Sequence, residues 1–334
     1  MRPKNPETTR RCRKPPRPSS ISAITNTPAA RKRKASKPRD ERRTRHTGHH
    51  RAVSDTPQEL LRATFEQVPE LYDRARPNYP PQIFDDLAAL AQLPVQARLV
   101  EIGCGTGRAT LPLAQRGYAI TCVELGERLA ATAQRKLATF PSVSVINANF
   151  ETWRPERLEF DAVVAFGAFH WLAPDLRYTK TAELLREHGK LGFVSTAHVL
   201  PSDGDPFFIE VQADYEAVIA HDPKTKAGGD RAFYSPPWWL PHPDALGDHS
   251  DEVVTNEIET SGRFHNVRAR RYLWDVIYTA DDYIAVLNTY SHHRALNDEA
   301  RERLLERIHR RIEARPERTV RKTYLAMLYV AERV

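Results

Sequence analysis

The sequence predicts an α/β fold with a doubly wound parallel sheet, and three observations support this prediction. A short apolar strand at residues 98–102 leads into a glycine-rich turn and then a helix, which is the first unit of such a fold. Five apolar strand segments alternate with helical segments between residues 98 and 195. The length of 334 residues suffices for one large domain or two small ones. We therefore expect a sheet with helices on both faces.

The first two strands have clear boundaries. The first strand carries one charged residue, Glu101, near its end. The helix after the turn ends at Gly117, a residue that adopts positive φ without a Cβ penalty. The second strand ends in another carboxylate, Glu124. These elements span about residues 109–116 (helix), 119–123 (strand) and 128–138 (helix).

The next three strands complete the parallel part of the sheet. They are predicted at residues 143–147, 161–166 and 190–195. A helix of about residues 176–187 and a turn at Gly189 precede the fifth strand. The resulting β-α-β alternation places the carboxyl ends of all five strands at one edge, where such folds bind ligands.

Residues 57–92 are predicted to form two helices with a break between them. Apolar residues recur every three or four positions on both sides of the break, as on amphipathic helices. Prolines 77 and 80 end the first helix, and Pro81 suits the first turn of the second.

The chain after residue 200 departs from the alternating pattern. Residues 200–250 are rich in aromatic side chains and read as an insertion between strands 5 and 6, placed where an acceptor pocket or a separate small core is expected. We then expect a strand at 267–273, a helix capped by Asp281 or Asp282 and running through Tyr290, a helix at 298–314 and a strand at 323–331. The aromatic residues of the insertion are Phe207, Phe208, Tyr215, Trp238 and Trp239.

Charge is concentrated in the first 51 residues. They hold 17 Lys and Arg against 3 Asp and Glu, whereas the whole chain is +7, so residues 52–334 carry −7. With so few large apolar residues, this segment is predicted to be a disordered basic arm, residues 1–55, ahead of one folded domain at 56–334. A polyanion-binding arm, a transit peptide and a solvated tail remain open for it.

The cysteines and the hydropathy pattern restrict the class of protein. Cys12, Cys104 and Cys122 fit neither a metal-binding spacing nor an even disulfide framework, which favours a reducing, cytoplasmic location. No apolar run reaches the length of a membrane span, and no apolar secretory segment begins the chain. We therefore expect neither a metal site nor membrane partners.

The glycine spacing distinguishes between nucleotide-like ligands. A dinucleotide fingerprint is G-x-G-x-x-G, but here the spacing is G-x-G-x-G and Arg108 stands where the third fingerprint glycine belongs. The string V-E-I-G-C-G-T-G at 100–107 resembles motif I of the class I S-adenosylmethionine-dependent methyltransferases. Upstream, Y-D-x-A-R-P-x-Y-P at 72–80 is similar to a segment that caps the cofactor cleft in a small-molecule subgroup, the trans-aconitate methyltransferase-like enzymes.

The resemblance implies a seven-stranded Rossmann-like sheet, with strand 7 inserted beside strand 5 and a cofactor core at about residues 95–197. It implies S-adenosylmethionine as cofactor, with Glu124 accepting both ribose hydroxyls and Asn149 at the adenine amine. The motif I residues would approach the methionine and ribose. The complete predicted cofactor set is Glu101, Gly103, Cys104, Gly105, Gly107, Glu124, Leu125, Asn149 and Phe150.

The loop after strand 4 reads Gly167-Ala168-Phe169-His170-Trp171 and lies beside the methyl group in the resembled family. His170 is the candidate general base, since an imidazole titrates near neutral pH. The alternative is that His170 and Trp171 begin the next helix and pack beneath it.

The predicted function is methyl transfer to a small-molecule acceptor. Two other classes remain open: a nucleic-acid methyltransferase or binding protein that uses the basic arm, and a nucleotide-dependent oxidoreductase on a Rossmann core. The acidic balance of residues 52–334 disfavours the first class, and Arg108 disfavours the second. Apart from non-specific contacts of residues 1–51, nucleic acid is not an expected partner.

Overall fold

The computed structural model describes residues 69–219 and 247–334, and all of them lie in one unit, Val53–Val334, of the two into which the chain divides. The predicted basic arm and the Trp238-Trp239 pair fall outside the described residues. The elements up to the fifth strand are α2 (Pro69–Ala75), α3 (Pro81–Leu90), β1 (Arg98–Ile102), α4 (Thr110–Gln115), β2 (Ala119–Glu124), α5 (Glu127–Leu137), β3 (Val143–Asn147), β4 (Phe160–Phe166), η2 (Phe169–Trp171), α6 (Pro174–Leu184) and β5 (Leu185–His198).

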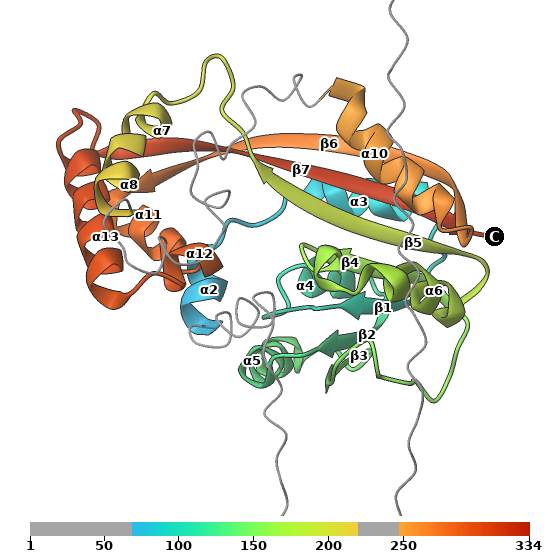
Figure 1. Cartoon of the computed structure of the whole chain (residues 1–334). Coiled ribbons are helices and arrows are strands. Elements are labelled where there is room, and N and C mark those ends of the chain that lie inside the picture. The colour runs from blue at the N-terminus through green and yellow to red at the C-terminus, as the bar shows by residue number, and fades with distance from the viewer. Residues whose placement is uncertain (1–68, 220–246) are drawn as a thin grey trace, which may run out of the picture. The chain divides into compact units, whose positions relative to one another are not determined.

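The C-terminal part adds helices and two long strands (Figure 1). Its elements are α7 (Phe207–Glu210), α8 (Gln212–Ile219), α10 (Gly247–Thr260), β6 (Phe264–Thr279), α11 (Ala280–Leu287), α12 (Ser291–Arg294), α13 (Asp298–Glu313) and β7 (Thr319–Arg333).

The seven strands form one sheet in the order β3-β2-β1-β4-β5-β7-β6. Strands β1 to β5 pair in parallel, and β7 is antiparallel to both β5 and β6. The predicted seven-stranded sheet, with its last strand inserted beside the fifth, is confirmed. The chain direction across the sheet reverses between β1 and β4, which is the switch point where doubly wound sheets bind ligands.

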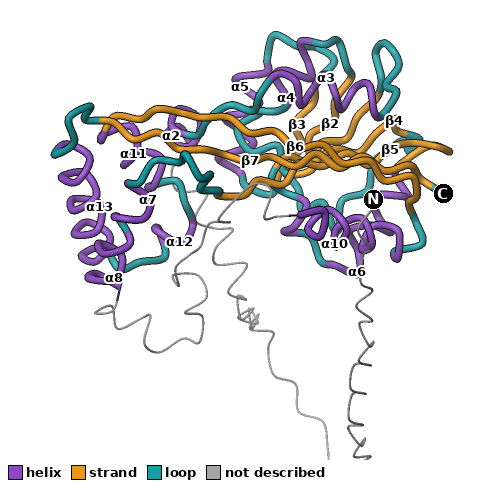
Figure 2. Tube along the Cα trace, turned by 90° about the horizontal axis from the view of Figure 1, so that it is seen from above, coloured by secondary structure: helices purple, strands orange, loops and turns teal. Residues whose placement is uncertain are grey.

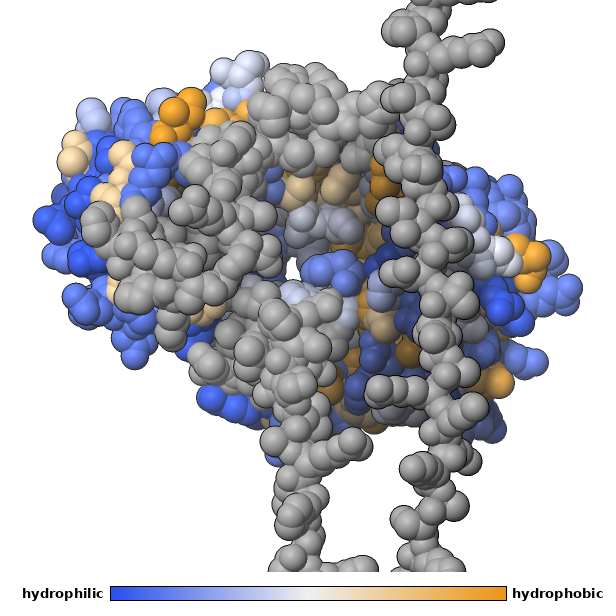
Figure 3. All heavy atoms as spheres, in the orientation of Figure 1, coloured by the Kyte–Doolittle hydropathy of each residue, from blue (hydrophilic) through white to orange (hydrophobic). Residues whose placement is uncertain are grey.

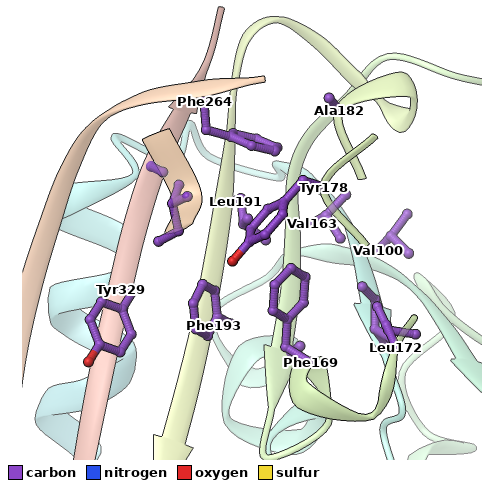
Figure 4. Close-up of a cluster of buried hydrophobic side chains, with 14 of the residues drawn as sticks. Val100, Val163, Phe169, Leu172, Tyr178, Ala182, Leu191, Phe193, Phe264 and Tyr329 are labelled. Atoms are coloured by element: carbon purple, nitrogen blue, oxygen red, sulfur yellow. The ribbon is translucent and has the colours of Figure 1, made fainter. Parts of the chain in front are cut away.

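Helices cover both faces of the sheet (Figure 2). Helices α3, α4 and α5 pack on one face through side chains such as Ile83, Leu113 and Leu137. Helices α6 and α10 cover the other face, where Phe169 stacks on Phe193 at 4.6 Å between ring centres (Figure 4). Each large apolar side chain removed from water contributes about 1.5–3 kcal/mol, so both layers hold the strand ends in fixed positions.

A third apolar cluster joins the C-terminal helices to the far ends of β6 and β7. Phe207, Phe208 and Tyr215 of the predicted insertion are buried in it, against Tyr283 of α11 and Leu304 of α13. These aromatic residues therefore form a small core of their own, and none of them lines the cavity described below.

Several element boundaries differ from the sequence prediction. The predicted helix 176–187 ends at Leu184, and β5 begins directly with a register break that leaves His188 at φ +56°. Strands β6 and β7 are longer than predicted because they continue to pair with each other beyond the end of β5, where the C-terminal helices pack on them. Neither Asp281 nor Asp282 caps α11: Thr279 does, and its hydroxyl accepts from the Asp282 amide at 3.2 Å. That helix also ends at Leu287 rather than Tyr290.

Candidate functional site

A cavity of about 580 Å³ opens at the carboxyl ends of β1, β2 and β4, beside the switch point of the sheet. This volume is in the range of small-molecule and cofactor sites. Tyr72 of α2 closes one side of it. The strand ends and loops provide the other lining residues: Ile102, Gly103, Gly105, Val123, Glu124, Leu125, Gly126, Glu127, Leu129, Ala148, Asn149, Phe150, Glu151, Phe166, Gly167, Ala168, Trp171 and Leu172.

The glycine turn after β1 forms the floor of the cavity. Gly103 and Gly105 both have positive φ, +61° and +57°, which glycine adopts without strain. A Cβ on Gly103 would lie 2.7 Å from the Ala168 Cβ, so the turn packs directly on the loop after β4. A Cβ on Gly105 would meet nothing within 4 Å, so the backbone there faces open space.

Glu124 is held rigidly at the end of β2. Its Oε2 accepts from the Gly105 amide at 2.7 Å, and its Oε1 accepts from the Gly126 amide at 2.8 Å. The residue is only 6 % exposed. These two bonds from backbone amides fix the orientation of the carboxylate, and Glu124 is among the residues that line the cavity.

Glu101 is oriented differently from the prediction. It is buried at 1 % exposure and does not line the cavity, and its Oε2 has no hydrogen-bond partner among the described residues. It shares a strand face with Leu99, which α4 covers, because alternate residues of a strand point the same way. Burial raises the pKa of Glu101 to about 7, and the neighbouring carboxylate of Glu124 acts in the same direction, against the lowering effect of the Thr110 hydroxyl.

The segment after β3 forms the opposite wall. Asn149 is exposed and lines the cavity, and its Oδ1 accepts from the Glu151 amide at 2.8 Å in a local turn. Its side-chain nitrogen therefore points away from that bond. Phe150 is buried below it, while Leu125, at the end of β2, is 51 % exposed at the cavity.

Helix α2 is attached to the glycine turn through Asp73. The Asp73 Oδ1 accepts from Thr106 Oγ1 at 2.7 Å and pairs with Lys136 Nζ at 2.8 Å. Burial would raise the pKa of Asp73, but the hydrogen bonds from Lys136 and Thr106 hold it below its ordinary value. Arg108 adds bonds to the Asp73 carbonyl, at 2.7 Å, and to the Pro77 carbonyl. Sequence reasoning used Arg108 only as a missing glycine and did not predict this clamp.

The three residues of η2, in the loop after β4, point in three different directions. Phe169 is buried in the core, Trp171 lines the cavity, and His170 between them is exposed and does not line it. The short 3-10 turn of η2 causes this, since successive side chains of such a turn point about a third of a revolution apart.

The structure thus brings part of the predicted set together. Gly103, Gly105, Glu124, Leu125, Asn149 and Phe150 line the cavity. Glu101, Cys104, Gly107 and His170 do not. Cys104 is buried, and a Cβ on Gly107 would contact the Leu137 side chain at 3.0 Å, so both positions serve packing. Tyr72 and Trp171 were not in the predicted site, although both lie in strings that the sequence analysis singled out.

The described residues contain neither a metal-binding cluster nor a membrane-spanning helix. Within 69–219 and 247–334, no group of three or more His, Cys, Asp or Glu side chains is arranged to hold a metal ion. None of the described helices is long and apolar enough to cross a membrane.

Comparison with known proteins identifies the region around this cavity. Residues 99–189 match the family model for a methyltransferase domain. An uncharacterized methyltransferase of Mycobacterium tuberculosis is 30 % identical over 148 residues, covering 40 % of this chain and 58 % of that protein. A putative methyltransferase of Bacillus subtilis is 26 % identical over 140 residues, 42 % of this chain and 52 % of that protein. The chain thus spans just over half the length of these relatives.

The fold has a solved counterpart. The structure of a putative type II methyltransferase from Anaeromyxobacter dehalogenans superimposes with a TM-score of 0.50 at 20 % identity, over 77 % of this chain and 97 % of that chain. This likeness concerns the fold.

Proposed function

Residues 99–189 belong to the class I S-adenosylmethionine-dependent methyltransferases, and from this premise we propose that the chain transfers a methyl group to a small-molecule acceptor. S-adenosylmethionine is the cofactor of this family. The observation that carries the proposal is Glu124, fixed by two backbone amides at the edge of a cavity that the glycine turn leaves open.

The cavity residues fit this cofactor. Because Glu124 is held at the cavity by two backbone amides and a carboxylate can accept from several donors at once, we assign it both ribose hydroxyls. The backbone at Gly105 faces open space and admits close approach of the methionine and ribose portion. Asn149 would donate its amide to a ring nitrogen of the adenine, because its oxygen is engaged with Glu151. Phe150 supports that wall from below.

The chemistry requires positioning more than acid or base groups. When bound, the cofactor supplies a methyl group on a cationic sulfonium, and transfer is an in-line displacement in which that charge disperses. The protein aligns the reacting atoms and excludes water. Tyr72, Trp171 and the loop at Gly167 also line the cavity and are not among the residues assigned to the cofactor, so we place the acceptor beside them.

His170 as general base stays a prediction. Its side chain is exposed outside the cavity lining, so it reaches an acceptor only from the solvent side. A His170→Ala variant with an unchanged rate at every pH would remove it from the mechanism. A loss of rate at the higher pH values, where an imidazole is unprotonated and can act as a base, would retain it.

The oxidoreductase alternative loses support at Arg108. This residue stands where a dinucleotide fingerprint has its third glycine, and it donates to the carbonyls of Asp73 and Pro77. The basic arm that a nucleic-acid enzyme would use lies outside the described residues, so the structure does not bear on that alternative. A reducing, cytoplasmic location remains part of the proposal, and Cys104 and Cys122 are both buried and unpaired.

The test is acceptor-dependent turnover. The full chain is incubated with S-adenosylmethionine and pools of small organic acids, phenols and amines, and S-adenosylhomocysteine is quantified. We expect its formation to depend on one acceptor pool and to be lost in Glu124→Gln. Turnover with RNA or DNA but with none of the small-molecule pools would contradict the proposed acceptor class.

A further inference from the structure

A cluster of cationic and hydrogen-bond-donating side chains lies beside the cofactor cavity, on the side of the C-terminal helices. Arg76, the residue directly after α2, connects the two regions. Its guanidinium lies 5.2 Å from the ring centre of Tyr72, which lines the cavity, and 4.1 Å from that of Tyr290. Its Nε donates to Thr289 Oγ1 at 2.7 Å and its Nη2 to the Thr289 carbonyl at 3.1 Å. The cluster therefore begins where the acceptor side of the cavity ends.

Lys322 enters the cluster from β7. It is 4 % exposed, and its ammonium lies 4.6 Å from the ring centre of Phe208 and 5.3 Å from that of Tyr324. Within the described ranges, neither Lys322 nor Arg76 forms an ion pair with a carboxylate. Burial of an unpaired ammonium is costly, so its position indicates that something else in the working protein compensates it.

Helix α12 supplies imidazoles to the same place. His293 is 1 % exposed, and its Nε2 lies 2.8 Å from the Tyr215 hydroxyl. Its ring lies 4.3 Å from that of His292 and 5.9 Å from that of Tyr290. His198, at the end of β5, contacts the Tyr290 ring edge-on at 5.4 Å. Figure 3 shows a gap near the centre of the molecule in the view of Figure 1.

Several buried polar atoms here lack hydrogen-bond partners within the part of the chain that the structure describes. Among the described residues, the Tyr290 hydroxyl, the Trp274 Nε1 and the His293 Nδ1 are buried without a hydrogen-bond partner. Trp274 stacks on Tyr324, so it belongs to the same cluster. An indole N–H and an ammonium can only donate. Since buried polar groups are normally satisfied, this surplus of donors and positive charge calls for a ligand that brings acceptor oxygens and negative charge.

Charge repulsion within the cluster points the same way. Burial lowers the pKa of Lys322 to about 7, and Arg76 lowers it further. Burial, Arg76 and Lys322 lower the pKa of His292 to about 4. The groups facing Lys322 and His292 are Arg76 after α2, His198 of β5, His293 of α12 and the phenols of Tyr290 and Tyr324. An anion among them would reverse these shifts, so its binding would take up protons.

We propose that Arg76, Lys322 and His293, with the Tyr290 hydroxyl, form an anion subsite that holds a carboxylate or phosphate group of the methyl acceptor. The inference rests on the proposed function and adds the substrate class to it. The aromatic rings of Tyr72, Tyr290 and Tyr324 border the charged groups, so the rest of the acceptor is apolar or planar. The charged end lies in the cluster and the methylated atom points back past Tyr72 to the cofactor.

The test compares charged and neutral probes of one shape. The full chain is saturated with S-adenosylhomocysteine and titrated calorimetrically with phenylacetate, phenyl phosphate and the neutral phenylacetamide at pH 8, in two buffers of different ionisation enthalpy. We expect at least one anion to bind about tenfold or more tighter than the amide, because a hydrogen bond to a charged group is worth about 1.5–3 kcal/mol. We also expect proton uptake. The tighter anion identifies carboxylate or phosphate as the group recognised.

Variants locate the effect. Lys322→Met removes the charge at similar length and is expected to lower anion affinity about tenfold or more, while Lys322→Arg retains the preference over the amide. The matched control is Lys190→Met, which removes a lysine that pairs with Glu332 at 2.9 Å on β7, and it should leave anion binding unchanged. The S-adenosylhomocysteine affinity should be the same in all three variants.

Two results would overturn the subsite. One is a wild-type protein that binds S-adenosylhomocysteine but prefers neither anion to the amide. The other is a Lys322→Met variant that binds the anions as the wild type does. Absence of S-adenosylhomocysteine binding is a different failure, because it contradicts the proposed function itself.

Discussion

Replacement of Glu124 by glutamine changes only the atom that the site depends on. The wild-type carboxylate accepts from Gly105 and Gly126 at 2.7 and 2.8 Å while 6 % exposed. In Glu124→Gln one oxygen becomes an NH₂ group, so one of these amides faces a donor. A hydrogen bond to a charged group is worth about 1.5–3 kcal/mol, and we expect a loss of this size in the free energy of unfolding.

The same change removes one charged acceptor from the ribose hydroxyls. A second loss of about 1.5–3 kcal/mol corresponds to about 10- to 150-fold weaker S-adenosylhomocysteine binding by calorimetric titration. The matched control is Glu127→Gln, at the same cavity, where the carboxylate is exposed and forms no hydrogen bond to the glycine turn. A Glu124→Gln variant that binds within about twofold of wild type, or no more weakly than Glu127→Gln, would refute the assignment.

Three further predictions follow from the same geometry. Gly103→Ala should lower the free energy of unfolding by about 2–4 kcal/mol in urea titrations, because the new Cβ would lie 2.7 Å from the Ala168 Cβ at a residue with φ +61°. Gly105→Ala should lower it by only about 1–2 kcal/mol, because nothing lies within 4 Å of the new Cβ, but it should weaken S-adenosylhomocysteine binding. Equal losses of stability in the two variants would contradict this. The pKa of Glu101 is raised to about 7 in the folded protein, so between about pH 4.5 and 7 the folded state holds a proton that the unfolded state has released. The free energy of unfolding should therefore fall by up to about 3 kcal/mol as the pH rises through this range. Glu101→Gln should abolish that fall in urea titrations, and a variant with the same pH dependence as the wild type would contradict the prediction. Arg108→Ala should speed amide hydrogen exchange in residues 69–81, because the guanidinium donates to two backbone carbonyls of that segment. Arg108→Lys should have a smaller effect, since an ammonium can still donate but lacks the planar geometry. Exchange rates equal to wild type in both variants would exclude the clamp.

The central strands were predictable because burial on both faces leaves a simple pattern. The boundaries of β1 are those predicted, since this strand is a short apolar run that is buried on both faces. Those of β3, a short strand at the sheet edge, are also as predicted, because turn residues flank it on both sides. Strand β6 was underestimated because it lies at the edge of the sheet and carries Arg268 and Arg270 at exposed positions. Polar and charged side chains are tolerated along the solvent-facing side of an edge strand, so a change from apolar to polar residues does not mark where this strand begins or ends.

In the site, positions set by the backbone were predictable and side-chain directions were not. The glycine turn and Glu124 follow from strand ends, which the sequence marks well. The outward direction of His170 depends on the phase of a three-residue turn, and the inward burial of Glu101 depends on which face α4 covers. The anion cluster was not predicted either, because Arg76, His293 and Lys322 are far apart in the sequence and come together only in the folded chain.

The most direct measurement is a calorimetric titration of the full chain with S-adenosylmethionine, S-adenosylhomocysteine and, separately, reduced nicotinamide dinucleotide. The account predicts micromolar binding of the first two, lost in Glu124→Ala, and no binding of the third. A folded protein that binds neither S-adenosyl compound, or that binds the nicotinamide dinucleotide instead, would contradict the claim that this cavity holds a methyl donor.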